Sequence, residues 1–265
     1  MLVLGTVYRP TSGTIRVNGY NVVEEANDVR KMIGISFQDP RVDGILSTFE
    51  VLNWHGKMTT SLSQSQRRRK VEEVIEQLDL KEGRDKRTWL LSGGMKKKVE
   101  NAKVFVQRPP VAVFDEPTAF LDVPSRLKVW RMIQQLREEG STVIVATNMM
   151  DEAERLSHKI AIMNQGKLVA HGTGKDLKAR IKGGEVLEIT VEDSREYNRE
   201  TLTQFKEVHH VVDEEKKILV YLNQGRLLLP KIVEVLTSQG LRIDSVHLKE
   251  VTLEDVFLAS TGHRL

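Results

Sequence analysis

The chain has 265 residues, of which 40% are hydrophobic and 29% are charged, the balance of a folded globular protein rather than a disordered one. Its 40 basic and 37 acidic residues give a net charge of +3, too even for the basic surface expected of a nucleic-acid-binding protein. The chain has no cysteine, which excludes disulfides and thiolate metal sites, and no run of about 18 to 20 apolar residues that could span a bilayer.

The first hundred residues begin with short strands and then turn helical. Asn18-Gly19 is a turn pair favoured in tight hairpins and predicts a short strand pair around it. A further strand is expected over 32–37. From about 47 to 107, apolar residues recur at helical spacing, which predicts a helical subdomain. Its basic run, 67–70, is predicted to be a solvated helix face.

Two apolar runs follow, and each ends in polar residues. They cover 111–116 and 142–148, and a helical stretch over 125–139 lies between them. Runs of this kind are typical of strands covered on both faces, so the segment predicts a βαβ unit of a parallel sheet. In such sheets ligands bind beyond the carboxyl ends of the strands, which is where the polar residues fall.

The composition changes past residue 172. A hairpin over 159–170 closes the first part of the chain, which predicts one domain over 1–172 and a second over 173–265. Strand patterns in the second alternate with two helical patterns, which predicts a small α+β domain of order β-α-β-β-α-β. The strand patterns cover 186–191, 208–212, 218–222 and 241–246, and a final helix is expected near 253–259.

Several short motifs occur in one order along the chain. They are residues 91–95 (Leu-Ser-Gly-Gly-Met) before a helix, 111–118 (Val-Ala-Val-Phe-Asp-Glu-Pro-Thr), 119–122 (Ala-Phe-Leu-Asp), and Gln38 upstream. Together they resemble the signature, Walker B, D-loop and Q-loop of the ATP-binding subunits of ABC (ATP-binding cassette) transporters. Residues 251–258 are similar to the tail of exporter ATPases of the ABC-2 and daunorubicin-resistance kind, or form a generic amphipathic helix.

This resemblance covers nearly the whole chain and implies an architecture. It is an incomplete α/β ABC-type (RecA-like) parallel-sheet core with an inserted helical subdomain, followed by the small C-terminal α+β domain. The resemblance also implies ATP and Mg²⁺ as cofactors, and a second ABC ATPase subunit and a transmembrane permease subunit as partners, with no nucleic acid. The expected location is cytoplasmic, peripheral on the inner face of the cell membrane, with a lean towards export.

The resemblance assigns Ser92, Gly93 and Gly94 to the γ-phosphate of an ATP held by the opposite subunit. The residue types suit the task, because these residues open a helix whose unpaired N–H groups and dipole can face an anion. Glycine lets the backbone approach closely, and the serine hydroxyl adds a donor. An isolated Ser-Gly-Gly would be a plain helix N-cap.

The acidic residues at the strand end receive separate roles from the resemblance. Asp115 would hold Mg²⁺ through water, and Glu116 would orient and deprotonate the attacking water, a division suited to phosphoryl transfer. Gln38 would bind Mg²⁺ or the attacking water and report the state of the site to the membrane subunit. Asp122 would bridge the two subunits. Two adjacent acids that cap the next turn are the alternative for Asp115 and Glu116.

Two departures from the family pattern are visible. Asn148 stands where the switch histidine is expected; it can donate a hydrogen bond to phosphate or cap the next helix, but it cannot carry an imidazolium charge. The phosphate-gripping pattern Gly-x-x-x-x-Gly-Lys-Ser/Thr (Walker A) occurs nowhere in the 265 residues. The resemblance places Met1 about one helical turn past that loop, so an N-terminal truncation is expected.

Three functions follow as hypotheses. The first is an exporter ATPase subunit that hydrolyses ATP with a partner or with its N-terminal residues restored. The second is a nucleotide-incompetent partner that supplies only its signature motif in trans. The third is a soluble, non-transport ABC ATPase that acts on nucleic acid or ribosomes, which the even charge balance and the lack of a second cassette disfavour.

Overall fold

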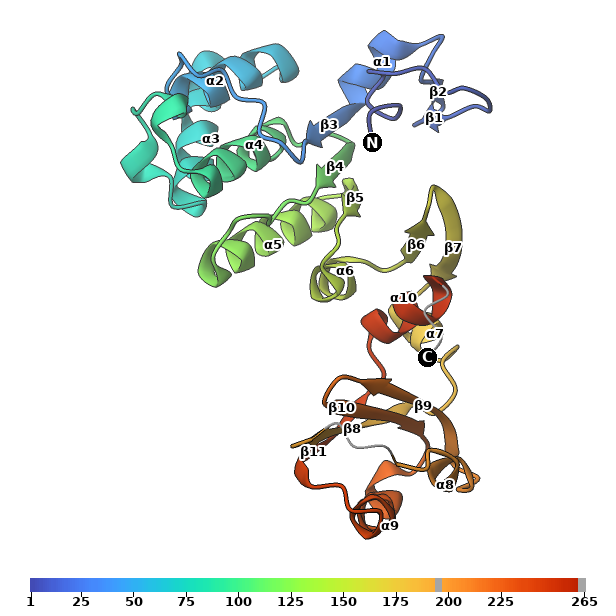
Figure 1. Ribbon diagram of the computed structural model, residues 1–265. Coiled ribbons are helices and arrows are strands. Elements are labelled where there is room, and N and C mark those ends of the chain that lie inside the picture. The colour runs from blue at the N-terminus through green and yellow to red at the C-terminus, as the bar shows by residue number, and fades with distance from the viewer. Residues whose placement is uncertain (194–196, 262–265) are drawn as a thin grey trace. The chain divides into compact units, whose positions relative to one another are not determined.

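The computed structural model describes residues 1–193 and 197–261 (Figure 1). They form two compact units, Met1–Leu156 and Ser157–Leu265. The hairpin over 159–170, which the sequence placed in the first domain, belongs to the second unit in the structure because the C-terminal helix packs against it. The domain boundary after residue 172 stays a prediction.

The first unit is built on a three-stranded parallel sheet, β3 (Ile33–Ser36), β4 (Val111–Asp115) and β5 (Thr142–Ala146), in the order β3-β4-β5. Helix α5 (Val123–Glu138) connects β4 to β5. The predicted βαβ unit is therefore confirmed. The N-terminal part adds three smaller elements, β1 (Arg16–Val17), β2 (Tyr20–Asn21) and α1 (Ala26–Met32). Their apolar side chains form a separate core cluster with Ile33 of β3 and Val113 of β4.

One expectation about this sheet is wrong. The apolar run of β5 was expected to be covered on both faces, as that of β4 is. Val143 and Val145 pack against the core, but Thr142 is exposed and Ile144 is 38% exposed. The reason is that β5 is an edge strand: within the described residues it pairs with β4 alone.

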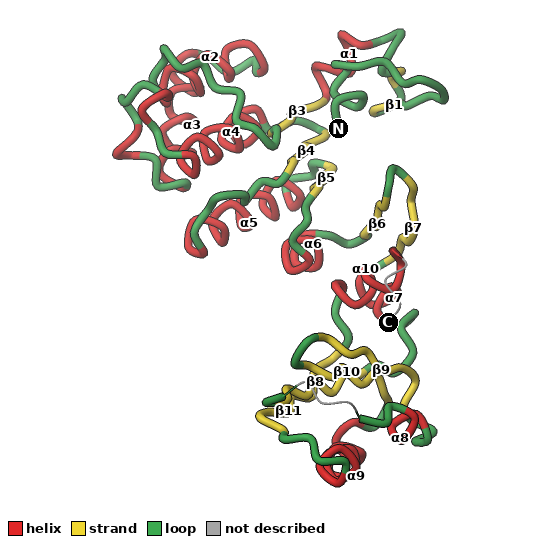
Figure 2. Tube along the Cα trace, viewed as in Figure 1, coloured by secondary structure: helices red, strands yellow, loops and turns green. Residues whose placement is uncertain are grey.

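The helical subdomain consists of α2 (Thr48–Thr59), α3 (Gln64–Gln77) and α4 (Gly93–Gln107), which lie together in Figure 2. Two short 3₁₀ helices, η1 (Lys81–Gly83) and η2 (Thr88–Leu90), join α3 to α4. Ser47 and Ser63 begin α2 and α3 with reciprocal capping boxes, which explains where these helices start. Apolar side chains of all three helices and of β4 and α5 form one core.

The second unit combines a hairpin with a small α+β fold. The elements in chain order are β6 (Ile160–Asn164), β7 (Lys167–Gly172), α7 (Gly174–Lys178), β8 (Glu185–Val191), α8 (Glu200–Thr203), β9 (Val208–Glu214), β10 (Lys217–Leu222), α9 (Gly225–Ser238), β11 (Ile243–Glu250) and α10 (Leu253–Thr261). The order from β8 to β11 is the predicted β-α-β-β-α-β. Antiparallel pairs β8–β11 and β9–β10 meet along β8 and β10. No helix in the described ranges is long and apolar enough to cross a membrane.

His55 links helix α2 to the sheet through a short polar chain. Its Nε2 lies 3.3 Å from Gln107 Oε1, and Gln107 Nε2 donates to the carbonyl of Ile33 at 3.1 Å. Burial, together with the nearby charge of Lys103, lowers the pKa of His55 from 6.5 to about 4, against a smaller opposing effect of the Gln107 bond. The imidazole is therefore neutral at pH 7.

We predict a pH dependence of stability that depends on His55. Between pH 6.5 and 4 the unfolded chain binds a proton that the folded chain excludes, so stability is full above pH 6.5 and falls as the pH drops towards 4. The loss is at most about 3 kcal/mol. Urea unfolding at several pH values should show a shallower decline for His55→Gln than for the wild type. Identical slopes would contradict the prediction.

The last helix is tied to the sheet of the second unit by a buried hydrogen bond. Tyr221 on β10 is 1% exposed, and its hydroxyl donates to Asp255 Oδ1 on α10 at 2.5 Å. Asp255 also caps its own helix, since its Oδ2 accepts from the amide and hydroxyl of Thr252. Burial and the neighbouring carboxylate raise the pKa of Tyr221, so the phenol stays a donor.

Removing the buried Tyr221 hydroxyl should lower the free energy of unfolding more than removing a similar exposed hydroxyl. Tyr221→Phe leaves a buried carboxylate oxygen without its partner, and we expect a loss of about 1–3 kcal/mol in the free energy of unfolding. Tyr197, whose hydroxyl donates to the exposed Asp213, is the matched control, and Tyr197→Phe should cost less than about 1 kcal/mol. Equal losses in urea unfolding would show that burial of the pair does not matter.

Candidate functional site

The carboxyl ends of β3 and β4 bring three predicted residues together. The two strands pair in register, Ser36 opposite Phe114, so the residues that follow them leave the sheet at the same edge. Gln38 Nε2 donates to Glu116 Oε2 at 3.2 Å, across 78 residues of sequence. Asp115 is the last residue of β4 and, like Glu116, is half-buried.

Glu116 leaves the strand through an unusual backbone conformation. Its φ of +45° lies in the left-handed region, which costs a non-glycine residue about 1 kcal/mol. Its N–H still donates to the carbonyl of Ala146 on β5 at 2.8 Å, so the ladder continues to this residue. The turn beyond it is fixed by Thr118, whose hydroxyl donates to the buried Glu152 of α6 (Met150–Leu156) at 2.7 Å. The position of Glu116 is thus set by its backbone bond to β5 and by the contact of Thr118 with α6.

The Ser-Gly-Gly motif begins helix α4. Ser92 is the N-cap, and its hydroxyl accepts from the amide of Met95 at 3.2 Å. The amides of the first turn of a helix have no partner within it, and the dipole makes that end positive. Capping and anion binding are therefore compatible roles here. Ser92 and Gly93 are exposed, as a contact with another subunit would require.

The start of α4 packs against the segment that leads into α5. A Cβ built on Gly94 would lie 3.0 Å from the carbonyl oxygen of Phe120, whereas one on Gly93 would meet nothing within 4 Å. Phe120 is 82% exposed and has a φ of +63°. Asp122 caps α5: its Oδ1 accepts from the amide of Ser125 at 2.9 Å, and these bonds lower the pKa of Asp122. Its predicted role between subunits stays a prediction.

Asn148 lies beyond the end of β5 and is exposed. Helix α6 begins two residues later, and the side chain that accepts an amide there belongs to Thr147, from Met149 N at 3.0 Å. Among the residues that the structure describes, no hydrogen bond from the Asn148 side chain is seen, so capping is not its role here. The contact with phosphate stays a prediction.

Sequence reasoning missed the buried charges behind this edge of the sheet. Lys97 and Glu100 on α4 are both 0% exposed, and Lys97 Nζ donates to the carbonyl of Asp115 at 2.8 Å. Burial lowers the pKa of Lys97, while Glu100 and Asp115 act to raise it. The run Lys96-Lys97-Lys98 reads as a solvated surface, so only the helical spacing of position 97 relative to apolar neighbours could have signalled its burial.

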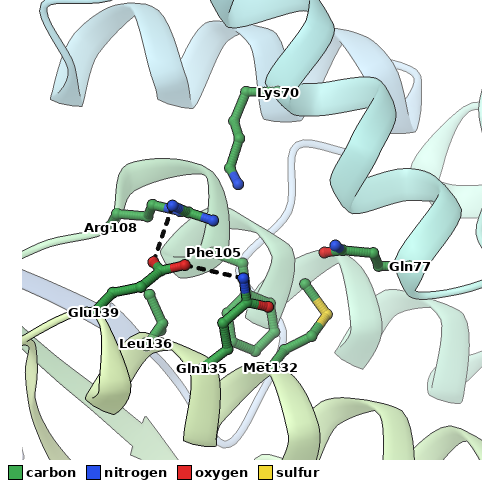
Figure 3. Close-up of a pocket in the computed structure, with 8 residues that line it drawn as sticks. All are labelled: Lys70, Gln77, Phe105, Arg108, Met132, Gln135, Leu136 and Glu139. Atoms are coloured by element: carbon green, nitrogen blue, oxygen red, sulfur yellow. Dashed lines mark hydrogen bonds and ion pairs between the residues drawn. The ribbon is translucent and has the colours of Figure 1, made fainter.

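A separate pocket lies between α3, the end of α4 and α5 (Figure 3). Arg108 pairs with Glu139 at 2.9 Å, and Gln135 Nε2 donates to the same carboxylate at 2.9 Å. Two residues of the basic run predicted to be solvated are exceptions. The Lys70 side chain is 15% exposed and borders this pocket, and the part-buried Arg67 donates to Asn53 Oδ1 at 2.9 Å, whereas Arg68 and Arg69 are exposed as predicted. None of the predicted site residues lines it.

Two family models match parts of this chain. The family described as "ABC transporter" matches residues 1–119, and the "ATP-binding protein DrrA1-3-like, C-terminal domain" matches residues 172–261. The daunorubicin/doxorubicin resistance ATP-binding protein DrrA of Streptomyces peucetius is 32% identical over 263 residues, 98% of this chain and 79% of that protein. The chain belongs to the ATP-binding subunits of ABC transporters.

Further ABC relatives and solved structures agree. The linearmycin resistance ATP-binding protein LnrL of Bacillus subtilis is 30% identical over 96% of this chain and 82% of its own length. The structure of an ATP-binding subunit of an ABC transporter superposes with a TM-score of 0.62 at 23% identity, covering 68% of this chain and 74% of that one. A dimeric ATP-binding cassette bound to ADP and phosphate gives a TM-score of 0.60 at 22% identity, covering 65% and 78%. These likenesses establish the ABC fold.

Gly93 and Gly94, at the start of α4, should respond differently to alanine. Gly94→Ala forces the Phe120 backbone to move by a few tenths of an ångström, and we expect a loss of about 1–2 kcal/mol in the free energy of unfolding. Gly93→Ala meets open space in the first turn of a helix, where alanine is favoured over glycine by up to about 1 kcal/mol, so stability should be unchanged or raised. Urea unfolding of both variants measures the difference, and equal losses would refute it.

Proposed function

We propose that this chain, together with a partner ABC ATPase subunit, binds and hydrolyses ATP at the edge formed by Gln38, Asp115 and Glu116, and couples hydrolysis to export through a separate membrane subunit. The observation that carries the proposal is the 3.2 Å contact between Gln38 Nε2 and Glu116 Oε2 beside Asp115. A carboxylate and an amide held together at a strand end suit the positioning of a water molecule and a cation for phosphoryl transfer.

The donors at this edge fit Mg²⁺. Carboxylate and amide oxygens are the ligands this cation prefers, and it keeps several waters or phosphate oxygens besides. Gln38 donates through its amide nitrogen, so its amide oxygen is the atom that can ligate a cation together with Asp115. No group of three or more acidic or histidine side chains that could hold a metal is found in the described ranges, so the nucleotide would complete the coordination. When bound, Mg²⁺ would neutralise phosphate charge.

The remaining residues are assigned to a second subunit. Ser92, Gly93 and Gly94 would contact the γ-phosphate of an ATP held by the partner, and the exposed Asp122 would bridge the two subunits. Asn148 would donate to phosphate without carrying the positive charge of a histidine. The partner is an ABC ATPase subunit, either a copy of this chain or a related one, and both would lie on the cytoplasmic face of the membrane against the permease.

Relatives support export as the direction of transport. They include proteins named for resistance to daunorubicin and linearmycin, and a Nod factor export ATP-binding protein of Burkholderia thailandensis that is 30% identical over 100% of this chain and 83% of its own length. We infer that the cargo is carried by the membrane subunit, and that this chain supplies the energy.

The test is ATP hydrolysis by the purified chain together with its membrane subunit. Glu116→Gln removes the base but keeps the size of the side chain, and we expect turnover to fall by about 100-fold or more. Glu82→Gln, at an exposed position on η1, is the matched control and should leave turnover unchanged. If Glu116→Gln has no effect, hydrolysis takes place in a site to which this chain contributes only its signature, and the proposal fails.

A further inference from the structure

One face of helix α4 carries buried polar side chains. Lys97, Glu100 and Asn101 follow the helical spacing that places residues on one side. Ser36 Oγ donates to Asn101 Oδ1 at 2.7 Å, and Asn101 Nδ2 donates to the carbonyl of Pro117 at 2.7 Å. This face therefore holds both the end of β3 and the turn after Glu116.

The segment between Phe37 and Arg41 relies on the same face. It belongs to no strand or helix, so its backbone groups need partners from elsewhere. Glu100 accepts from the amide of Phe37 at 3.3 Å with one carboxylate oxygen and from the amide of Arg41 at 2.8 Å with the other. Lys103 also pairs with Glu100 at 2.8 Å and donates to the carbonyl of Arg41 at 3.1 Å.

Lys97 binds carbonyl groups of the segment whose amides Glu100 binds. Its ammonium group has three N–H donors and no acceptor. Three carbonyl oxygens accept from it, those of Phe37 at 2.7 Å, Gln38 at 3.2 Å and Asp115 at 2.8 Å. Lys97 thus ties the backbone of Gln38 to the backbone of Asp115, while Glu100 holds the amide of Phe37.

We propose that Lys97 is a positioning residue that, together with Glu100, fixes the Phe37–Arg41 segment so that the Gln38 side chain meets Glu116. The Gln38 side chain is exposed and has a long, flexible stem, so its contact with Glu116 depends on where its backbone is held. The importance of the contact between Gln38 and Glu116 for catalysis rests on the proposed function. The clamp that Lys97 and Glu100 form on the Phe37–Arg41 segment can be tested without nucleotide.

Lys98 provides a matched control. It is the next residue of the same helix, is 9% exposed, and its Nζ also donates to a backbone carbonyl, that of Leu78 at 2.9 Å. Lys98 holds the end of α3 rather than the segment that carries Gln38. Replacing either lysine with methionine removes a buried charge from α4, so a general loss of stability would be common to both.

The experiment is amide hydrogen exchange of the whole chain without nucleotide. Lys97→Met should speed exchange of the Phe37 and Arg41 amides by about tenfold or more, because the segment loses its charge-assisted bonds to Lys97. Lys98→Met should leave these amides within about twofold of the wild type, and Lys97→Arg, which keeps a buried cationic donor, should restore most of the protection. Equal acceleration in both methionine variants, or acceleration spread over the whole unit, would overturn the proposal.

A second variant covers the case in which Lys97→Met does not fold. Glu100→Gln keeps one acceptor and the size of the side chain, and it should also expose residues 37–41 selectively; unchanged exchange there would overturn the clamp. With the membrane subunit present, Lys97→Met should lower kcat by about tenfold with little change in KM, and should add nothing in a Gln38→Ala background. Additive losses would overturn the positioning role. If the wild type shows no turnover, the proposed function fails and exchange alone decides the clamp.

Discussion

The interior of the first unit is shaped by a loop that needs hydrogen-bond partners. Residues 37–41 pair with no strand, and side chains of α4 bond to the amides of Phe37 and Arg41 and to the carbonyls of Phe37, Gln38 and Arg41. A buried backbone group without a partner costs about 1–3 kcal/mol, so side chains of α4 must provide partners where a neighbouring strand would otherwise do so. At Phe37, Lys97 donates to the carbonyl oxygen and Glu100 accepts from the amide. The placement of Gln38, and with it the edge at which it meets Glu116, follows from this requirement.

The parallel register of the sheet does the rest of the positioning. Asp115 lies opposite Ala146, and the ladder continues to Glu116 before the positive φ of that residue turns the chain away. Strands that run in the same direction end at one edge of the sheet. Residues from distant parts of the sequence therefore meet at that edge because of the strand direction alone. The glutamate is held by backbone bonds on one side and the glutamine by side chains of α4 on the other.

The sequence predicts the regular parts of this arrangement and the chemistry-bearing motifs. Alternation and apolar runs locate β4, β5 and the β-α-β-β-α-β order of the second unit, because burial of a strand or helix face leaves a periodic trace. The exposure of Ile144 could not be predicted, since an apolar run does not say whether a strand is central or at an edge. The burial of Lys97 has only a weak trace in the sequence, the helical spacing of position 97 relative to apolar neighbours, because three consecutive lysines carry no apolar pattern and the acceptors of Lys97 are carbonyls that any residue types could offer.

Stability alone does not explain the buried charges of α4. Replacing a buried ion pair with apolar side chains of similar volume is often neutral or stabilising, because the desolvation of the charges is costly. Apolar side chains at positions 97 and 100 would pack, but they could not donate to three carbonyls or accept two amides, and the loop would have to find another path or recruit water. The charges therefore supply the hydrogen-bond partners of residues 37–41 in this conformation. Ser92 is the N-cap of the same 15-residue helix that carries Lys97 and Glu100, so one helix links the exposed N-terminal residues to the side chains that hold residues 37–41. A displacement of α4 relative to β4 would therefore stretch the hydrogen bond between Lys97 Nζ and the Asp115 carbonyl. It would also move Gln38 relative to Glu116.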